Sequence, residues 1–427
     1  MLSLASFMPL YKLIAVFAIM LTALRLRVGL LLSIALGSLS LALLFALPVA
    51  LWPETVWNAL TTPQTLYLAI ILALILVLSD VLDKTGQAGR LMESLAGYLR
   101  HPRLRLVFFP ALIGLLPMPG GAVFSAPMLG NVAERLNVPG EDKVLLNYWF
   151  RHIWETTWPL YPGLILAATI CDISIGVLVL YGLPALGITL TLGWIFLLRP
   201  GVLPLDISKE ATITGERDIR KVLVAGRPLL VAIVGAVVME IGIGLLLPGI
   251  PFEIGVMAAL LAAILVALAQ NPGSGPIVRD ALCRKHLWTM LGVVVVIFIF
   301  KDTLHAAGVI TELAKLAGGR TALFITCTLL PFLVGFVSGI TLAYVGSTFP
   351  LITGLLAQAG MQDQQMPYIM LAIFSGYTGI MSSPLHICFV LTCQYFNVGI
   401  GKAWRRIALP SLLIFLSGVA YFLLLSR

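Results

Sequence analysis

The stretch Pro117-Met118-Pro119-Gly120-Gly121 divides a long apolar segment of the chain into two short arms. A second apolar segment is divided in the same way by Val337-Ser338-Gly339-Ile340-Thr341. Backbone that leaves the helical conformation inside a bilayer is tolerated only where it is buried in protein or lines a cavity. The two interruptions therefore predict a binding site inside a membrane protein.

The composition supports this prediction. The chain has 427 residues, of which 60% are hydrophobic and 11% are charged, and its mean hydropathy is +1.04. These values describe an all-α polytopic membrane protein and exclude a soluble fold. The formal net charge is +8. Because the basic residues are scattered over many short loops, we expect them to face anionic lipid and expect no nucleic-acid partner.

The five cysteines lie in or beside apolar segments: Cys171, Cys283, Cys327, Cys388 and Cys393. Their spacing does not resemble that of metal ligands, so we expect small core residues, no bound metal and no other cofactor. The first apolar run, residues 8–24, has no basic residue before it and no small-residue cleavage site. We expect it to be retained as a membrane span.

About ten segments are long enough to cross the hydrocarbon core, which takes roughly 20 residues each. They are residues 8–24, 28–51, 63–79, 143–170, 173–198, 227–247, 252–269, 287–303, 366–396 and 405–425. Two further segments, 106–136 and 321–358, could be kinked spans or re-entrant hairpins that enter and leave the membrane on the same side.

The positions of the 27 lysines and arginines decide between these alternatives. With two hairpins, most basic residues fall on one side of the membrane, whereas two complete spans would divide them evenly. Cytoplasmic loops carry the excess of basic residues. The sequence therefore predicts two hairpins, a multi-pass protein of the prokaryotic inner membrane, and both termini outside the cell. The first hairpin enters from the cytoplasm and the second from outside.

The two halves of the chain follow the same plan. Residues 78–86 align with residues 300–308, and a hairpin follows each. The long segments 143–170 and 366–396 come next, and each contains a polar patch with a proline. An odd number of spans separates the two units, so the second is inverted. We expect a first repeat at 8–198, a cytoplasmic linker at 199–226 and a second repeat at 227–425. Inverted repeats with broken helices are typical of secondary transporters.

The stretch from Pro117 to Pro127, together with this architecture, resembles an uncharacterised integral-membrane family of the ion transporter superfamily. That superfamily also holds carriers of dicarboxylates, gluconate and other anions. The resemblance covers nearly the whole chain. It implies paired re-entrant hairpins, a homodimer, coupling to a cation or proton, and elevator-type alternating access. The chain lacks the Ser-Asn-Thr tip signature of the dicarboxylate carriers, which argues against a sodium-dicarboxylate carrier.

The hairpin tips supply the first candidate site residues. Free N–H groups at a helix break attract anions, and glycine lets the backbone approach a ligand closely. The candidates for substrate binding at the tips are Gly120, Gly121, Ser125, Ser338, Gly339 and Thr341. These small residues could instead serve only tight helix packing.

The polar patches supply the remaining candidates. Arg151 and Glu155 are four residues apart, and we expect them to share a helix face inside the membrane, with His152 pointing away. Arg151 would bind the negative charge of the substrate, and Glu155 would carry the coupling proton. The alternative is a structural ion pair. His386 is a second candidate for coupling. The other substrate-binding candidates are Asn147, Thr156, Thr157, Thr378, Ser382 and Ser383.

These features together predict a secondary active transporter of a small polar, anionic solute, coupled to H⁺ or Na⁺. The alternatives are a channel or a non-transporting scaffold. An intramembrane enzyme is not expected, because the chain has neither His-Glu-x-x-His nor the Gly-x-Ser-Gly of rhomboid-type proteases, and no phosphate-binding loop.

Overall fold

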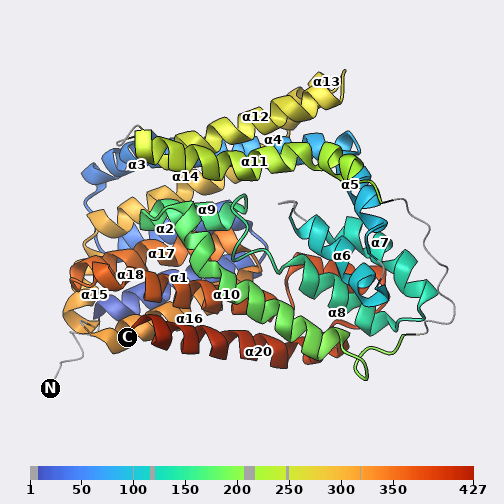
Figure 1. Ribbon diagram of the computed structural model, residues 1–427. Helices are drawn as coiled ribbons and strands as arrows, with labels where there is room; N and C mark the ends of the chain where they lie inside the picture. Colours follow the sequence, from blue (N-terminus) through green and yellow to red (C-terminus); the bar gives the residue numbers. More distant parts are fainter. Residues whose placement is uncertain (1–7, 100, 116–120, 206–216, 247–249, 318) are drawn as a thin grey trace.

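The computed structural model describes residues 8–99, 101–115, 121–205, 217–246, 250–317 and 319–427. These residues form helices and connecting loops and contain no strand, so the all-α prediction is confirmed. Figure 1 shows the helices running mostly in one direction across the molecule.

The described residues of the first half form ten α-helices. They are α1 (Met8–Arg25), α2 (Leu30–Leu44), α3 (Trp52–Thr61), α4 (Pro63–Lys84), α5 (Gln87–Ala96), α6 (Pro102–Gly114), α7 (Ala122–Arg135), α8 (Gly140–Arg151), α9 (Pro162–Cys171) and α10 (Ile175–Gly193), with short turns η2 (Val49–Leu51) and η3 (Trp194–Leu198).

The described residues of the second half also form ten. They are α11 (Ile219–Leu246), α12 (Phe252–Gln270), α13 (Gly275–Leu282), α14 (Lys285–Ala306), α15 (Val309–Ala317), α16 (Arg320–Ser338), α17 (Thr341–Gln358), α18 (Gln365–Met381), α19 (Ile387–Tyr395) and α20 (Ile400–Leu425), with one short turn η5 (Gln362–Gln364).

Local sequence explains several helix ends. Proline stands at the first position of α4, α6 and α9, where its missing N–H would have no partner within the helix. Helix α16 is capped at its C-terminus by Gly339, whose φ of 63° lies in the left-handed region that glycine adopts without steric cost. Helix α9 is capped by Asp172 in the same conformation, with φ 53°.

Eight helices of the described ranges are long and apolar enough to cross a membrane: α1, α4, α10 with η3, α11, α12, α14, α16 and α20. The chain is therefore a membrane protein with several spans. The number differs from the predicted ten because 143–170 and 366–396 are each divided into two short helices and α2 has only 15 residues. Helix α16, with 19 residues, is long enough although it was expected to be a hairpin arm.

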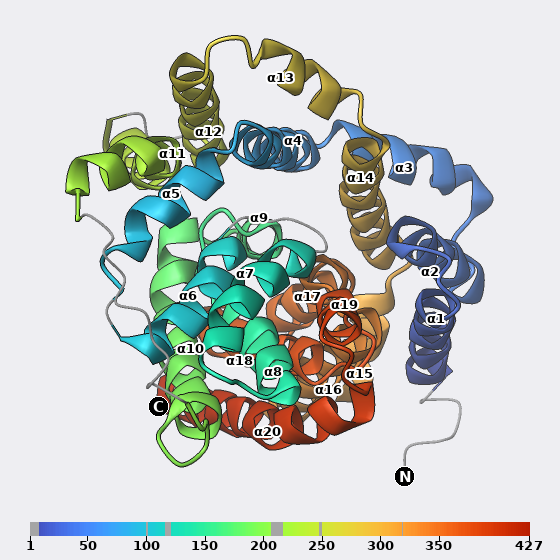
Figure 2. The same cartoon turned by 90° about the vertical axis from the view of Figure 1, so that its right-hand side faces the viewer.

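The helices form two groups, which Figure 2 shows in cross-section. Helices α11, α12, α4, α14, α2 and α1 contact one another in that order and form a curved layer, which we name the outer arc together with α3 and α13. Helices α6–α10 and α16–α20 pack beneath this layer and form the inner bundle. The arc covers one side of the bundle.

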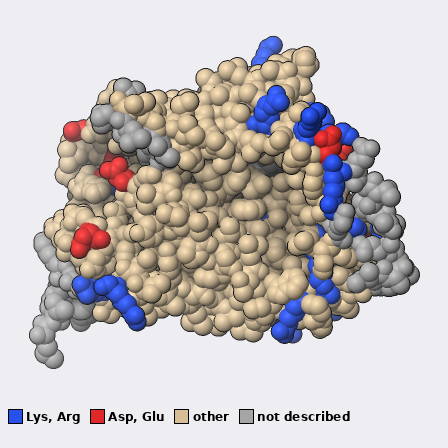
Figure 3. Space-filling view, in the orientation of Figure 1, with Lys and Arg blue, Asp and Glu red and all other residues tan. Residues whose placement is uncertain are grey.

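Charge is distributed unevenly along the molecule. On the face drawn in Figure 3, lysine and arginine gather mainly at the end that holds α5 and α13, and a broad belt without charge follows. Leucines of α20 are half exposed, among them Leu412 at 50% and Leu416 at 51%. An apolar belt with exposed leucines suits contact with lipid rather than water.

Candidate functional site

Two interrupted helices meet in the inner bundle. Helix α8 ends at Arg151 and α9 begins at Pro162, while α18 ends at Met381 and α19 begins at Ile387. We name residues 152–161 the first junction and residues 382–386 the second junction. Each junction contains a proline, which cannot donate the backbone hydrogen bond that would continue a helix.

Hydrogen bonds hold the two junctions together. His386 Nε2 lies 3.0 Å from His152 Nε2, and the Tyr377 hydroxyl donates to the carbonyl of His152 at 3.1 Å. The Tyr148 hydroxyl donates to the carbonyl of Ile380 at 2.9 Å. These contacts join residues more than 200 positions apart in the sequence, so the site exists only in the folded chain.

The turn between α16 and α17 lies against both junctions. The Thr341 hydroxyl, at the start of α17, donates to Glu155 Oε2 at 2.7 Å. A Cβ added at Gly339 would lie only 3.0 Å from the Cα of His386. A Cβ at Gly163, in the first turn of α9, would overlap the Thr341 side chain. The turn therefore packs so closely against both junctions that only small residues fit at these positions.

The pair α6 and α7 approaches the same place from another side. A Cβ at Gly121, at the start of α7, would overlap the guanidinium of Arg151, and one at Gly114 would overlap the Arg151 carbonyl. The Trp154 indole donates to the carbonyl of Ala111 in α6 at 2.7 Å. Both helix pairs therefore contact the first junction. Gly120 lies outside the described residues.

A cavity of about 220 Å³ opens between the inner bundle and the outer arc. Its polar wall belongs to the bundle and consists of Arg151, His152, Glu155, Tyr161, Thr341, His386 and Cys388. The facing wall comes from the outer arc and is mainly apolar, with Leu30, Leu72, Leu76 and Met290 beside His286. The cavity is smaller than a typical pocket for a drug-sized ligand, and its few convergent polar groups suit a small polar solute.

The charged groups of the cavity are almost fully buried. Glu155 is 5% exposed and Arg151 is 8% exposed. Arg151 Nη1 donates to Cys388 Sγ at 3.2 Å, and Glu155 Oε1 lies 3.9 Å from His152 Nε2. Ionisable groups at membrane depth are costly and mark ligand or ion pathways. This network is the strongest candidate for a functional site.

Two expectations about the first junction are wrong. Helix α8 ends at Arg151, so Arg151 and Glu155 do not share a helix face; the chain turns at the junction and brings both to the cavity. His152 does not point away from them, because its Nε2 lies 3.5 Å from Arg151 Nη1 and 3.9 Å from Glu155. The spacing of four residues implied helical geometry that a broken helix does not have.

Of the predicted site residues, the described part of the chain brings Arg151, Glu155, Gly339, Thr341 and His386 to the cavity. The remaining described candidates do not line it. Ser125 contacts the Gly121 carbonyl, Asn147 donates to Thr392, Ser338 donates to the Val334 carbonyl, Ser382 to that of Thr378, and Ser383 to that of Phe336. Thr156, Thr157 and Thr378 are buried, and within the described ranges their hydroxyls lack a hydrogen-bond partner.

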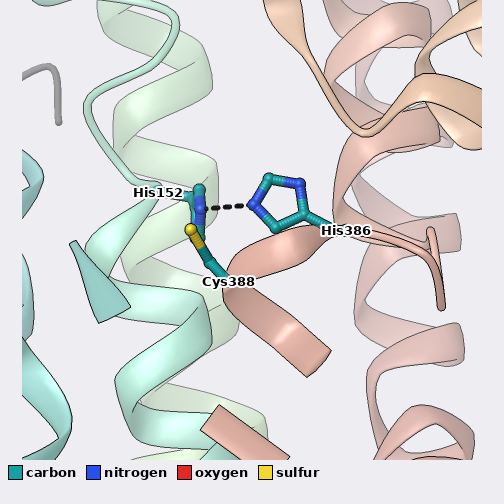
Figure 4. Close-up of side chains that lie close together, drawn as sticks. All are labelled: His152, His386 and Cys388. Carbon is teal, nitrogen blue, oxygen red and sulfur yellow. Dashed lines mark hydrogen bonds between the residues drawn. The ribbon is translucent and has the colours of Figure 1, made fainter. Parts of the chain in front are cut away.

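Sequence reasoning missed Cys388 and gave His152 no role at the site. Figure 4 shows the two histidine rings meeting and the sulfur of Cys388 beside the His152 ring. One ligand atom from each of these three residues lies within 4.8 Å of the other two. The signal was weak: His386 and Cys388 are two residues apart at the start of a helix, but His152 is distant in sequence.

Residues 3–424 match the model of the family described as Protein of unknown function (DUF401), and the chain belongs to this family. No curated protein matches the sequence.

Proposed function

We propose that the protein is a secondary active transporter that carries a small anion together with a proton across the prokaryotic inner membrane. The observation that carries the proposal is the cavity, in which one arginine and one glutamate are buried between two groups of helices. Broken helices and turns that converge on a buried site are the recurring design of such carriers.

An inverted repeat of the two halves is supported by the order of the elements. Each half has ten α-helices within the ranges that the structure describes, α4 and α14 both have 22 residues, and a short α3 or α13 precedes each. Contacts between the halves also correspond: α2 packs on α14 as α12 packs on α4, and α7 packs on α19 as α17 packs on α9. We therefore propose that residues 8–198 and 227–425 are the repeats and that 199–226 links them.

Re-entrant hairpins are supported by the depth of the junctions. Helices α8 and α9 have 12 and 10 residues, which correspond to about 18 and 15 Å. Their junction therefore falls about halfway through a hydrocarbon core of about 30 Å. Gly121 and Gly339 lie against this level, and α6 packs on α7 as α16 packs on α17. A hairpin arm crosses only about half of the hydrocarbon core. Helix α16 has 19 residues, so as such an arm it must tilt or extend beyond the hydrocarbon.

The charges of the cavity suggest how a proton is coupled to the anion. With both histidines neutral, the positive charge of Arg151 is cancelled while Glu155 is ionised. Protonation of Glu155 leaves one net positive charge, which attracts an anion in surroundings of low polarity. The anion and the proton would then bind together, and a monovalent anion would be carried without net charge movement.

Elevator-type movement is supported by the two walls of the cavity. The polar groups belong to the inner bundle, while the outer arc contributes mainly leucine and methionine side chains. An apolar surface makes no hydrogen bonds that would have to break when the bundle slides. The bundle can therefore carry the site past the arc. The membrane orientation is supported by charge, because basic residues gather at the end opposite the C-terminus.

Proton uptake into proteoliposomes tests the proposed function. A pH-sensitive dye inside the liposomes would report acidification when gluconate, methanesulfonate, sulfate or phosphate is added outside, with protein-free liposomes as the background. We expect acidification with at least one anion, and its loss in Glu155→Gln. Glu253→Gln is the matched control, because Glu253 is equally buried but does not line the cavity. A channel or a scaffold would give no proton uptake that depends on Glu155.

A further inference from the structure

We propose that His152, His386 and Cys388 form a binding site for a divalent transition metal ion of the zinc class. The three side chains come from the first junction, the second junction and the start of α19, and all are at most 5% exposed. They form the only such cluster of metal-ligating groups among the described residues. Imidazole and thiolate are the ligands that zinc prefers in proteins.

The distances between the ligand atoms fit a metal site after a small movement of the side chains. The ligand atoms of the three residues lie within 4.8 Å of one another, and the two Nε2 atoms are 3.0 Å apart. Zinc bonds of about 2.0–2.3 Å in a tetrahedron place ligand atoms roughly 3.3–3.7 Å apart. A side-chain shift on the order of 1 Å would therefore complete the geometry, and the histidine nitrogens would move slightly apart.

His152 is held in the tautomer that metal binding requires. Its Nδ1 lies 2.6 Å from the carbonyl of Tyr148, which only accepts hydrogen bonds, so Nδ1 carries the proton. Nε2 then presents its lone pair to Cys388 and His386. A metal-binding histidine usually donates its other ring nitrogen to a carbonyl or carboxylate in this way. With Nδ1 of His152 protonated, the 3.0 Å contact between the two Nε2 atoms makes His386 Nε2 the donor to this lone pair.

The surrounding charges make a dication acceptable beside Arg151. The guanidinium donates to Cys388 Sγ at 3.2 Å and would offset the charge of the thiolate that binds metals. Binding would release the thiol proton, and the His386 proton would move to Nδ1. The thiolate and the Glu155 carboxylate, 3.9 Å from His152 Nε2, offset the positive charge. All three ligands line the cavity, so a small exogenous ligand in the cavity could reach the metal as the fourth ligand.

Metal binding would also alter transport where the proposed function holds. A bound dication adds two positive charges and the thiolate removes one, so the cavity would attract an anion while Glu155 is still ionised. The metal-loaded protein would then bind the anion without its proton. Zinc is therefore expected to inhibit proton-coupled uptake, a consequence that rests on the proposed function. The binding test below does not require transport.

Cobalt spectroscopy of the purified protein in detergent tests the site directly. We expect stoichiometric Co²⁺ binding, a near-ultraviolet thiolate-to-cobalt band, visible bands of a four-coordinate ion, and displacement by Zn²⁺. Azide should shift the visible bands because it could reach the metal from the cavity as the fourth ligand. Cys388→Ser should remove the near-ultraviolet band and weaken binding by about 100-fold or more, since even loss of an outer partner costs roughly 10- to 100-fold.

Cys393→Ser is the matched control, because Cys393 is buried in the same helix but is not part of the cluster. It should bind Co²⁺ as the unmodified protein does. Cys388→His keeps a nitrogen ligand at the position and should bind Co²⁺ without the thiolate band, which separates loss of the ligand from misfolding. The proposal is overturned if saturating Co²⁺ gives no thiolate band, if the band persists in Cys388→Ser, or if azide leaves the visible bands unchanged.

Discussion

The first and second junctions have the same backbone design and different chemistry. Each interrupts a helix of the inner bundle beside a helix pair, and each contains a proline. The first junction and the helix end before it carry Arg151 and Glu155, whereas the second has Ser382, Ser383 and His386 and no fixed charge. The fold brings the two breaks together, and under the proposed function the first half alone supplies the charge that selects a ligand.

Removal of the Arg151 charge, which distinguishes the first junction from the second, should have the largest effect on transport. Arg151→Gln is expected to abolish anion-dependent proton uptake, because a hydrogen bond to a charged group contributes about 1.5–3 kcal/mol, or roughly 10- to 150-fold in affinity. Dye acidification in proteoliposomes measures the loss. Arg151→Lys should restore part of the activity, because lysine keeps the charge without the planar donor geometry. Uptake in Arg151→Gln at the level of the unmodified protein would remove Arg151 from the site.

Neutralisation of Glu155 should separate anion movement from proton movement. Glu155→Gln keeps an amide that can accept from Thr341 but cannot exchange a proton. We expect exchange of labelled anion across the liposome membrane to continue, while a pH gradient no longer drives accumulation. The two assays on one preparation provide the comparison. Accumulation that still follows the pH gradient would assign the proton to another residue.

The turn at Gly339 should be the next most sensitive position. Its φ of 63° and its contact with His386 oppose any side chain. Gly339→Ala is expected to lower stability by about 1–2 kcal/mol, because the left-handed conformation costs about that much in other residues, and to slow transport. Gly187→Ala in α10, where an added Cβ meets nothing within 4 Å, is the control. Equal thermal unfolding midpoints for the two variants would contradict the close packing of the turn against His386.

Changes at the uncharged second junction should have the smallest effect. Ser383 donates to the carbonyl of Phe336 at 2.5 Å, so Ser383→Ala removes one neutral hydrogen bond. We expect a loss of about 0.5–1.5 kcal/mol in stability and little change in anion selectivity. Unfolding curves and an anion panel measure both quantities. Altered anion selectivity would mean that the second junction also takes part in ligand recognition.

The sequence was sufficient to predict the helical membrane fold and the broken helices, because apolar length and proline position are local signals. It also pointed to Arg151, Glu155, Thr341 and His386, which line the cavity, since charge or polarity is conspicuous in apolar segments. It could not place His152 correctly, because helical spacing does not hold across a break. Cys388 gave only the weak signal of its spacing from His386, and the apolar wall from the outer arc depends on packing between distant segments.

The balance between a pH gradient and an anion gradient tests proton coupling through Glu155 most directly. For a transported monovalent anion, one proton per anion predicts that an opposing pH gradient of about one unit stops net flux down a tenfold anion gradient, because each is worth about 1.4 kcal/mol. An imposed membrane potential should not shift this balance. Flux that follows the potential, or that no pH gradient can stop, would contradict a protonated glutamate paired with a bound anion.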